Sequence, residues 1–273
     1  EEELKNRAAN SIGETLRREP GVSSTFFGPG ASRPVIRGLG GDRISVLDSG
    51  IGSIDASATS PDHAVSVEPA TAEKIEIVRG ASTLLYGSSA AGGVVNVFSG
   101  RIPRSLPGDG ADGALRIGRS SVDEGVETAG AFDAALGRGF VFHGEGWYRK
   151  ADDYGIPGFA ESEALRAEEA AAGGAPAEES FGIVENSAYE TKGGAAGLSR
   201  VFDSGFIGLS ATALKTRYGV PGGHEGEGGV TIGLKQRRLD FDSAVDRDLW
   251  LFDRVKMRVG YADYEHAEFE PDG

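Results

Sequence analysis

The sequence contains no cysteine, which excludes disulfide bridges, thiolate metal sites and cysteine nucleophiles. It also lacks any run of about 18 apolar residues, so we expect no transmembrane helix. Basic residues are in short supply: 28 Lys and Arg stand against 42 Asp and Glu, and the formal net charge is −14. That sign argues against nucleic acid as a partner, because phosphate binding requires a basic surface.

Glycine, in contrast, is abundant. It supplies 43 of 273 residues, about twice its ordinary share, and 13 Phe, 7 Tyr and 2 Trp accompany it. We find no nucleophile elbow, phosphate-binding loop or dinucleotide fingerprint, so we do not expect an enzyme. A glycine-rich, aromatic, acidic chain without cysteine is typical of secreted or outer-membrane β proteins.

The chain divides near residue 105, in a linker rich in proline and glycine. Before the linker, residues 73–80 alternate apolar and charged side chains with a period of two, which indicates a half-buried strand. Ser11 and Glu14 have the spacing of a capping box and predict a helix that begins there. We therefore predict a mixed α/β domain over residues 1–105 and a second domain over residues 106–273.

The second domain has the pattern of long antiparallel strands. About seven segments alternate apolar and polar residues: 113–121, 126–136, 139–150, 187–202, 205–217, 229–245 and 249–266. In the last of them, Val255 and Met257 oppose Arg254, Lys256 and Arg258. One apolar and one polar face fits a membrane barrel with lipid outside and a wet lumen inside, and it also fits a soluble antiparallel sheet.

The connections between these segments favour the membrane barrel. Three alternate connections, at residues 136–139, 203–205 and 246–248, are tight turns, whereas those at 151–186 and 217–228 are long. Short turns on one rim and long loops on the other are typical of outer-membrane barrels. Within the longer loop, residues 161–179 predict a short acidic helix or an irregular acidic segment.

Aromatic residues near the strand ends are also typical of a barrel, in which they form girdles at both membrane interfaces. The expected outer girdle contains Trp147, Tyr148, Tyr218, Tyr261 and Tyr264, and the inner one Trp250 and Phe252. Seven strands cannot close a bacterial barrel, which needs an even number, and eight strands leave no room for a domain inside. We therefore expect this sequence to be the front portion of a longer protein.

Several motifs resemble a known family. Residues 15–22, 34–38, 73–80, 84–87 and 92–97 are similar, in order and spacing, to the plug of TonB-dependent outer-membrane receptors. The resemblance implies a plug followed by about seven of an expected 22 barrel strands, in a bacterial outer membrane. It also implies a monomeric barrel in contact with outer-membrane lipid, energised from the periplasmic side by the TonB complex, with no prosthetic group. Nothing in the sequence clearly supplies the TonB box that precedes the plug in this family.

Two arginines match positions that, in the family, lock the plug to the barrel. Arg37 and Arg79 would pair with barrel glutamates, which we expect beyond residue 273. Arginine suits this role because it stays charged and binds carboxylates through two hydrogen bonds. The alternative is that each arginine only caps the turn of its own strand.

A narrower resemblance concerns the zinc-receptor branch of the family. Asp62 and His63 match its metal-binding Asp-His pair on the plug, and residues 218–222 and 234–238 are also similar to it. Imidazole nitrogen and carboxylate oxygen are good Zn²⁺ ligands, which suits a chain without cysteine. An ordinary Asx turn with an exposed histidine is the alternative.

Further metal candidates lie in the second domain. His224, Glu225 and Glu227 stand where the zinc branch carries a histidine-rich loop, although a plain acidic surface loop explains them as well. His266, near Glu268 on the last strand, is another candidate on the same rim.

Three functions remain open. The first is import of a metal ion, zinc foremost, or of a metal complex. The second is a receptor for a siderophore, haem or another organic chelate. The third, of a different class, is a surface binding protein that does not transport.

Overall fold

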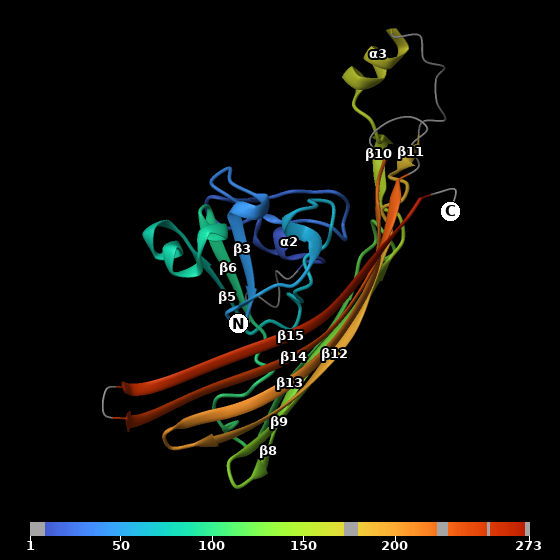
Figure 1. Ribbon diagram of the computed structural model, residues 1–273. Helices are drawn as coiled ribbons and strands as arrows, with labels where there is room; N and C mark the ends of the chain where they lie inside the picture. The colour runs from blue at the N-terminus through green and yellow to red at the C-terminus, as the bar shows by residue number, and fades with distance from the viewer. Residues whose placement is uncertain (1–8, 172–179, 223–228, 250–251, 271–273) are drawn as a thin grey trace.

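The computed structural model describes residues 9–171, 180–222, 229–249 and 252–270. A compact N-terminal part, called the plug below, lies against the concave face of a curved seven-stranded sheet, called the wall below (Figure 1). The chain is thus a mixed α/β plug followed by antiparallel strands, as the sequence predicts.

The plug is built around a four-stranded mixed sheet in the order β4-β3-β6-β5. Its elements are α2 (Ile12–Leu16), β1 (Val22–Ser24), β2 (Pro34–Ile36), η1 (Gly41–Arg43), β3 (Ile44–Asp48), β4 (Ile51–Gly52), η2 (Ala56–Ala58), β5 (Lys74–Val78), η3 (Gly80–Tyr86), η4 (Ser88–Ala90) and β6 (Gly93–Phe98). The central strand β6 carries Val94, Val95 and Val97, all at most 1% exposed, because layers cover it on both sides. Apart from Asn96, whose buried side chain accepts a hydrogen bond from the Gly50 amide, this is the apolar run that a strand covered on both faces requires.

The plug helix begins where the sequence predicts, but its capping box does not form. Ser11 is the N-cap of α2 and makes no side-chain capping bond. Its hydroxyl is hydrogen bonded to the hydroxyl of Ser32 instead, and the Ser32 hydroxyl also accepts from the Glu14 amide. Ser32, which is distant in sequence, therefore accepts the amide hydrogen bond that the capping box would have satisfied.

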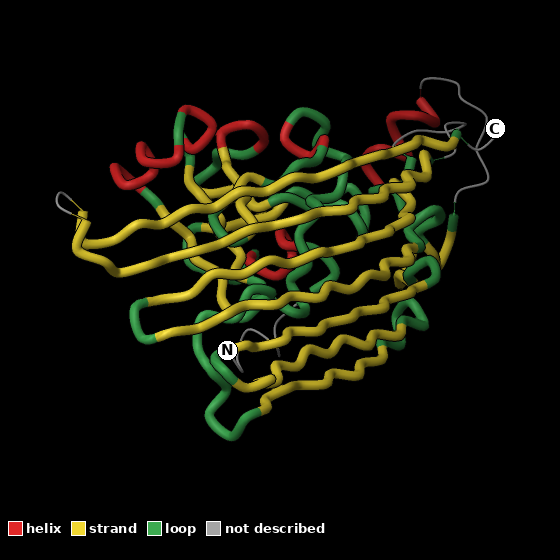
Figure 2. Tube along the Cα trace, turned by 60° about the horizontal axis from the view of Figure 1, so that its bottom comes forward, coloured by secondary structure: helices red, strands yellow, loops and turns green. Residues whose placement is uncertain are grey.

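The wall is a seven-stranded antiparallel sheet in the order β15-β14-β13-β12-β9-β8-β7, so each strand pairs with its neighbours along the chain (Figure 2). Its strands are β7 (Ala111–Arg119), β8 (Val126–Gly137), β9 (Phe140–Ala151), β12 (Tyr189–Phe202), β13 (Gly205–Val220), β14 (Val230–Leu249) and β15 (Phe252–Phe269). All seven expected strands are present, and their ends agree with the expected ones to within four residues.

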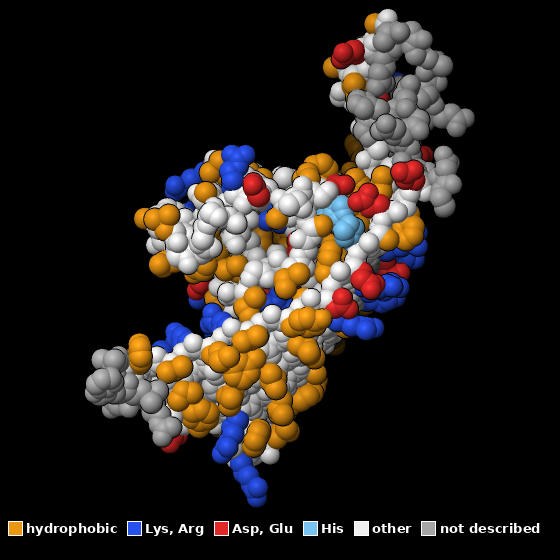
Figure 3. Space-filling view, in the orientation of Figure 1, with side chains coloured by type: hydrophobic (Ala, Val, Ile, Leu, Met, Phe, Trp, Pro, Cys, Tyr) orange, Lys and Arg blue, Asp and Glu red, His pale blue; other side chains and the backbone are white. Residues whose placement is uncertain are grey.

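The two faces of the wall differ in the way a barrel requires. On the convex face Leu115, Leu209, Met257 and Tyr261 are at least half exposed, and Figure 3 shows hydrophobic side chains spread over the sheet. On the concave face Ser210 and neighbouring polar residues are buried. An apolar outer face and a polar inner face are the arrangement of an outer-membrane barrel wall, in which the outer face meets lipid.

The expected outer aromatic girdle is wrong for three of its members, one of which is Tyr264, on the inner face of β15 beside His266. Trp147 is 4% exposed and Tyr218 is 1% exposed, and both point toward the plug. Tyr148 and Tyr261 do face outward. The reason is the period of two along a strand, which sends adjacent residues to opposite faces whatever their height in the membrane. Trp250 lies outside the described residues.

The long connection after β9 projects beyond the end of the wall (Figure 1). It contains the hairpin of β10 (Gly155–Phe159) and β11 (Phe181–Ile183), with α3 (Glu163–Ala171) between them. The expected acidic helix is therefore present over its first half, and residues 172–179 lie outside the described ranges. None of the described helices combines the length and the apolar character needed to cross a membrane.

Candidate metal site between the plug and the wall

A short turn of the plug carries Asp62 and His63 to the wall. The turn follows η2, and it is closed by a hydrogen bond from the His63 amide to the Ser60 carbonyl (3.1 Å). The Ser60 hydroxyl donates to Asp62 Oδ1 at 2.7 Å. The alternative of an exposed histidine does not hold, because His63 is only 2% exposed.

Asp62 orients the imidazole of His63. Its Oδ1 lies 3.0 Å from His63 Nδ1. Burial alone would raise the pKa of Asp62, but the hydrogen bonds from Ser60 and His63 outweigh it and hold this pKa below its ordinary value. The other ring nitrogen, Nε2, is turned toward the wall, and it carries a lone pair when the ring is neutral with its proton on Nδ1.

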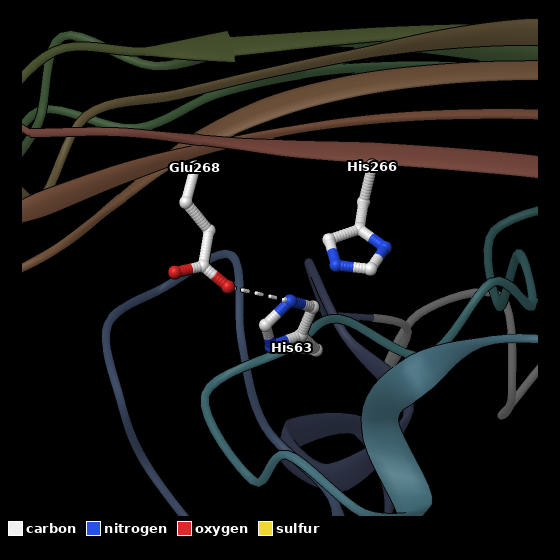
Figure 4. Close-up of side chains that lie close together, drawn as sticks. All are labelled: His63, His266 and Glu268. Carbon is white, nitrogen blue, oxygen red and sulfur yellow. Dashed lines mark ion pairs between the residues drawn. The ribbon is translucent and has the colours of Figure 1, made fainter. Parts of the chain in front are cut away.

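The wall supplies two further ligand groups opposite that nitrogen. His266 and Glu268 lie two residues apart on β15 and so share its inner face. Glu268 Oε1 is 3.3 Å from His63 Nε2, and the rings of His63 and His266 meet edge to face with centroids 4.7 Å apart (Figure 4). One ligand atom from each of the three residues lies within 4.8 Å of the other two.

One possible metal-ligand atom at this site is buried and makes no hydrogen bond. Among the described residues, His63 Nε2 is a buried polar atom with no hydrogen-bond partner. A metal ion between the three residues would satisfy it. In a tetrahedral zinc site the metal–ligand distances are about 2.0–2.2 Å, so ligand atoms lie roughly 3.3–3.5 Å apart. Small side-chain movements of His266 and Glu268 suffice to reach that spacing. Figure 3 shows histidine side chains beside acidic ones where the plug meets the wall.

This geometry changes the sequence-based reading of Asp62. Its Oδ1 is occupied by Nδ1 of His63, on the far side of the ring from Glu268. Asp62 therefore fits the part of a carboxylate that fixes the tautomer of a metal-binding histidine, rather than that of a direct ligand. Glu268 takes the carboxylate position among the three donors. The expected candidates His224, Glu225 and Glu227 lie outside the described residues.

A buried ion pair also fastens the plug to the wall. Arg149 of β9 donates from Nη1 and Nη2 to the two carboxylate oxygens of Glu68, each at 2.8 Å. The two side chains are 3% and 2% exposed. Glu68 also accepts from the Ala70 amide at 2.7 Å. A fork-to-fork pair of this kind is both strong and directional.

Two further buried ion pairs, both made by Arg101, hold the segment that joins the plug to the wall. Arg101 Nη1 is 3.0 Å from Asp48 Oδ2 of β3, and Arg101 Nε is 2.6 Å from Glu145 Oε1 of β9. Burial would lower the pKa of Arg101, but Glu145 and Asp48 outweigh it and raise the pKa above its ordinary value. His143 of β9 is buried nearby, with its Nδ1 2.9 Å from Asp133 Oδ1.

The two arginines expected to lock the plug form no ion pair with the wall strands that the structure describes, and the glutamates expected to bind them lie beyond residue 273. Arg37 is exposed, has a positive φ of 51°, and forms no ion pair with any residue in the described ranges. Arg79 donates from Nη1 to the Pro20 carbonyl at 2.8 Å. Pro20 lies 59 residues from Arg79 in the sequence, so this contact joins two segments of the plug and does not cap the turn of the arginine's own strand. The ion pairs of Glu68 and Arg101 do join the plug to the wall, and no sequence motif predicts either of them.

Comparisons with known proteins agree with this architecture. Residues 1–94 match the family model of the TonB-dependent receptor plug domain. The vitamin B12 transporter BtuB of Photobacterium profundum is 36% identical over 142 residues, which make up 50% of this chain and 23% of that protein. The hemin receptor of Yersinia enterocolitica is 37% identical over 94 residues, or 33% of this chain and 13% of that protein. The matched stretches thus span less than a quarter of either relative.

Among solved structures, the copper transporter OprC superposes with a TM-score of 0.74. The superposition covers 97% of this chain and 37% of that one, at 18% sequence identity. At this identity the likeness is one of fold, and it extends over both the plug and the wall.

Proposed function

We propose that this chain, which carries a TonB-dependent receptor plug and the opening strands of the receptor's outer-membrane barrel fold, serves the uptake of a divalent metal ion, with Zn²⁺ as the first candidate. The boundary between plug and barrel falls near residue 105 in this proposal. The cargo is bound where the plug meets the wall and is a substrate, not a resident cofactor.

One observation supports the proposal: the buried Nε2 of His63, which makes no hydrogen bond, lies 3.3 Å from Glu268 Oε1, and one ligand atom each of His63, His266 and Glu268 lies within 4.8 Å of the others. Two imidazoles and one carboxylate are a donor set that Zn²⁺ accepts readily, with the fourth position left to water or to another ligand. Three protein ligands also suit a transport site, because they hold the ion reversibly. Copper is the alternative cation, since imidazole suits Cu²⁺ as well, and the solved copper transporter shares the fold.

An organic chelate is the second candidate cargo. The named ligands of the two curated relatives, vitamin B12 and hemin, favour it. The geometry of the histidines argues against haem held between them. A porphyrin plane between two axial imidazoles requires ring centroids about 6 Å apart or more, from two metal–nitrogen bonds of about 2 Å. The rings of His63 and His266 are 4.7 Å apart and perpendicular, which leaves no room for a macrocycle.

The remaining parts of the proposal concern capture and release. An excess of acidic residues, −14 overall and including Glu225 and Glu227, would attract cations, and His224 would offer them a nitrogen ligand. Release requires the plug to move, and we assign that step to the TonB complex on the periplasmic side. Arg37 and Arg79 would lock the plug to glutamates of later strands.

The test is zinc titration calorimetry on the metal-free protein in detergent. We expect His63→Ala and His266→Ala each to weaken Zn²⁺ binding by at least tenfold, and Glu268→Gln to weaken it by a similar factor. Glu265→Gln is the matched control, because Glu265 lies on the same strand but on its opposite face. Unchanged zinc affinity in His63→Ala would refute the metal assignment.

Two further outcomes distinguish the alternatives. Sites built from nitrogen and oxygen ligands generally bind Cu²⁺ more tightly than Zn²⁺. If the affinity for Cu²⁺ exceeds that for Zn²⁺ by more than this general preference, copper would replace zinc as the proposed cargo. A chain that stays monodisperse without detergent would favour the surface binding protein over the receptor.

A further inference from the structure

Tyr218 of β13 reaches from the wall to the turn that carries His63. Its hydroxyl accepts a hydrogen bond from the Ala64 amide at 2.7 Å and donates one to the Asp62 carbonyl at 3.2 Å. The two peptide groups lie on either side of His63. One side chain of the wall thus holds the backbone before and after the candidate metal ligand.

The ring of Tyr218 has no freedom to follow a displaced turn. It is 1% exposed and packs in a cluster with Ala31, Ala64 and Tyr189. Gly30 lies so close beneath it that a Cβ at that position would be 2.4 Å from the Tyr218 Cβ. The hydroxyl is therefore a fixed point of the wall.

The sheet register connects this fixed point to the other ligands. Tyr218 is paired with Ile232 of β14, and Ile232 is paired with Glu268 of β15. Tyr218 and Glu268 therefore lie in one row of the wall, two strands or about 9.6 Å apart. His63 is held against one end of that row by the Tyr218 hydroxyl, while its ring meets the other end.

We propose that Tyr218 is a positioning residue of the metal site: its hydroxyl sets the place of His63 relative to His266 and Glu268. This inference rests on the proposed function, since it concerns the same site. Tyr218 contacts no ligand atom. It acts through the peptide groups that flank His63, and metal binding depends on it because ligand distances must be met to within about 0.2 Å.

Removing the hydroxyl should weaken the site without removing any ligand. In Tyr218→Phe the Ala64 amide loses its partner in a place where Ala64 is only 8% exposed, so the turn must shift to satisfy it. We expect the affinity for Zn²⁺ to fall about tenfold, which corresponds to the loss of one or two ordinary hydrogen bonds.

Tyr189 provides the matched control. It is the register partner of Tyr218 on β12 and belongs to the same buried cluster. Its hydroxyl is in hydrogen-bonding contact with the side chain of Asn10, away from the 62–64 turn. Tyr189→Phe therefore removes a hydroxyl from the same layer and should leave the zinc affinity within about twofold of the wild type.

The experiment uses the whole chain in detergent, with Zn²⁺ for affinity and Co²⁺ as a spectroscopic probe of coordination. We expect Tyr218→Phe to lower the zinc affinity about tenfold and to alter the visible absorption of bound Co²⁺, and Tyr189→Phe to change neither. In a His63→Ala background, which retains His266 and Glu268, Tyr218→Phe should cause no further loss, because its effect passes through His63. A general loss of folding would instead lower the affinity in both backgrounds.

Two results would overturn the inference. One is a Tyr218→Phe protein with wild-type zinc affinity and Co²⁺ spectrum. The other is an equal loss from Tyr218→Phe with and without His63. If either occurs while His63→Ala still weakens binding, the metal site stands and only the role of Tyr218 fails. If His63→Ala itself binds Zn²⁺ normally, the proposed function fails and this inference fails with it.

Discussion

Replacing Glu68 by alanine should release the middle of the plug from the wall. The substitution removes the carboxylate that takes both Nη groups of Arg149 and leaves the guanidinium unpaired at a position where it is 3% exposed. Breaking a buried ion pair from one side costs about 3–5 kcal/mol, because the remaining charge is not solvated. The Ala70 amide loses its acceptor as well.

The effect should be local and measurable by hydrogen–deuterium exchange. If the pair holds residues 64–72 against the wall, its loss lowers the free energy of local opening by about 3 kcal/mol. That decrease corresponds to an increase of about a hundredfold or more in the hydrogen-exchange rate of these residues. Glu68→Ala combined with Arg149→Ala should cost less than the sum of the single changes, since the double variant buries no unpaired charge. Glu190→Ala is the control, because the Lys192–Glu190 pair is exposed and screened by water.

Two outcomes would refute this reasoning. Exchange of residues 64–72 that is unchanged in Glu68→Ala would mean that the pair does not hold the segment. Single costs that add fully in the double variant would mean that Glu68 and Arg149 contribute independently, through packing and not through their mutual attraction.

Three further predictions follow from close contacts and from charge. Gly30→Ala should destabilise the protein by about 1–3 kcal/mol in denaturant unfolding, because its Cβ would lie 2.4 Å from the Tyr218 Cβ; unchanged stability would contradict the close packing. Asp62 has a lowered pKa, so its contribution to stability is present above its ordinary pKa and is lost as the pH falls through the lowered value. The melting temperature of the wild type should therefore fall more steeply than that of Asp62→Asn between about pH 5 and pH 2, and parallel curves would contradict this. Gly197→Ala would bring a Cβ to 1.7 Å from the Arg101 carbonyl oxygen, so the linker should leave the wall and be cut faster by protease, and an unchanged cleavage rate would oppose this.

The strands of the wall could be predicted because their signal is local. Alternation with a period of two lies within each segment, and turn residues mark the ends. The same alternation, followed further along β15, leads from Arg254, Lys256 and Arg258 to His266 and Glu268 on one face. The sequence therefore contained the information to pair His266 with Glu268 and to separate both from Glu265.

Contacts between the plug and the wall could not be predicted in this way. Glu68 follows no strand pattern, and nothing near it indicates that its partner is Arg149 on β9. The aromatic girdle was misjudged for the related reason that height in the membrane and direction of a side chain are independent. Trp147 and Tyr148 are adjacent, yet one packs on the plug and the other faces outward.

The candidate metal site and the Glu68–Arg149 pair act on one segment of the plug, and this has a thermodynamic consequence. His63 and Glu68 are five residues apart, and each meets a different strand of the wall. A cation held by His63, His266 and Glu268 would bridge plug and wall, so it would bind the seated plug better than the displaced one. Linkage then requires the converse by the same factor: whatever the seated plug adds to the affinity for the cation, the cation adds to the stability of the seat. Displacing the plug with the cation bound would therefore cost more free energy than displacing the empty plug, and the difference would equal the coupling free energy between the ion and the seated plug.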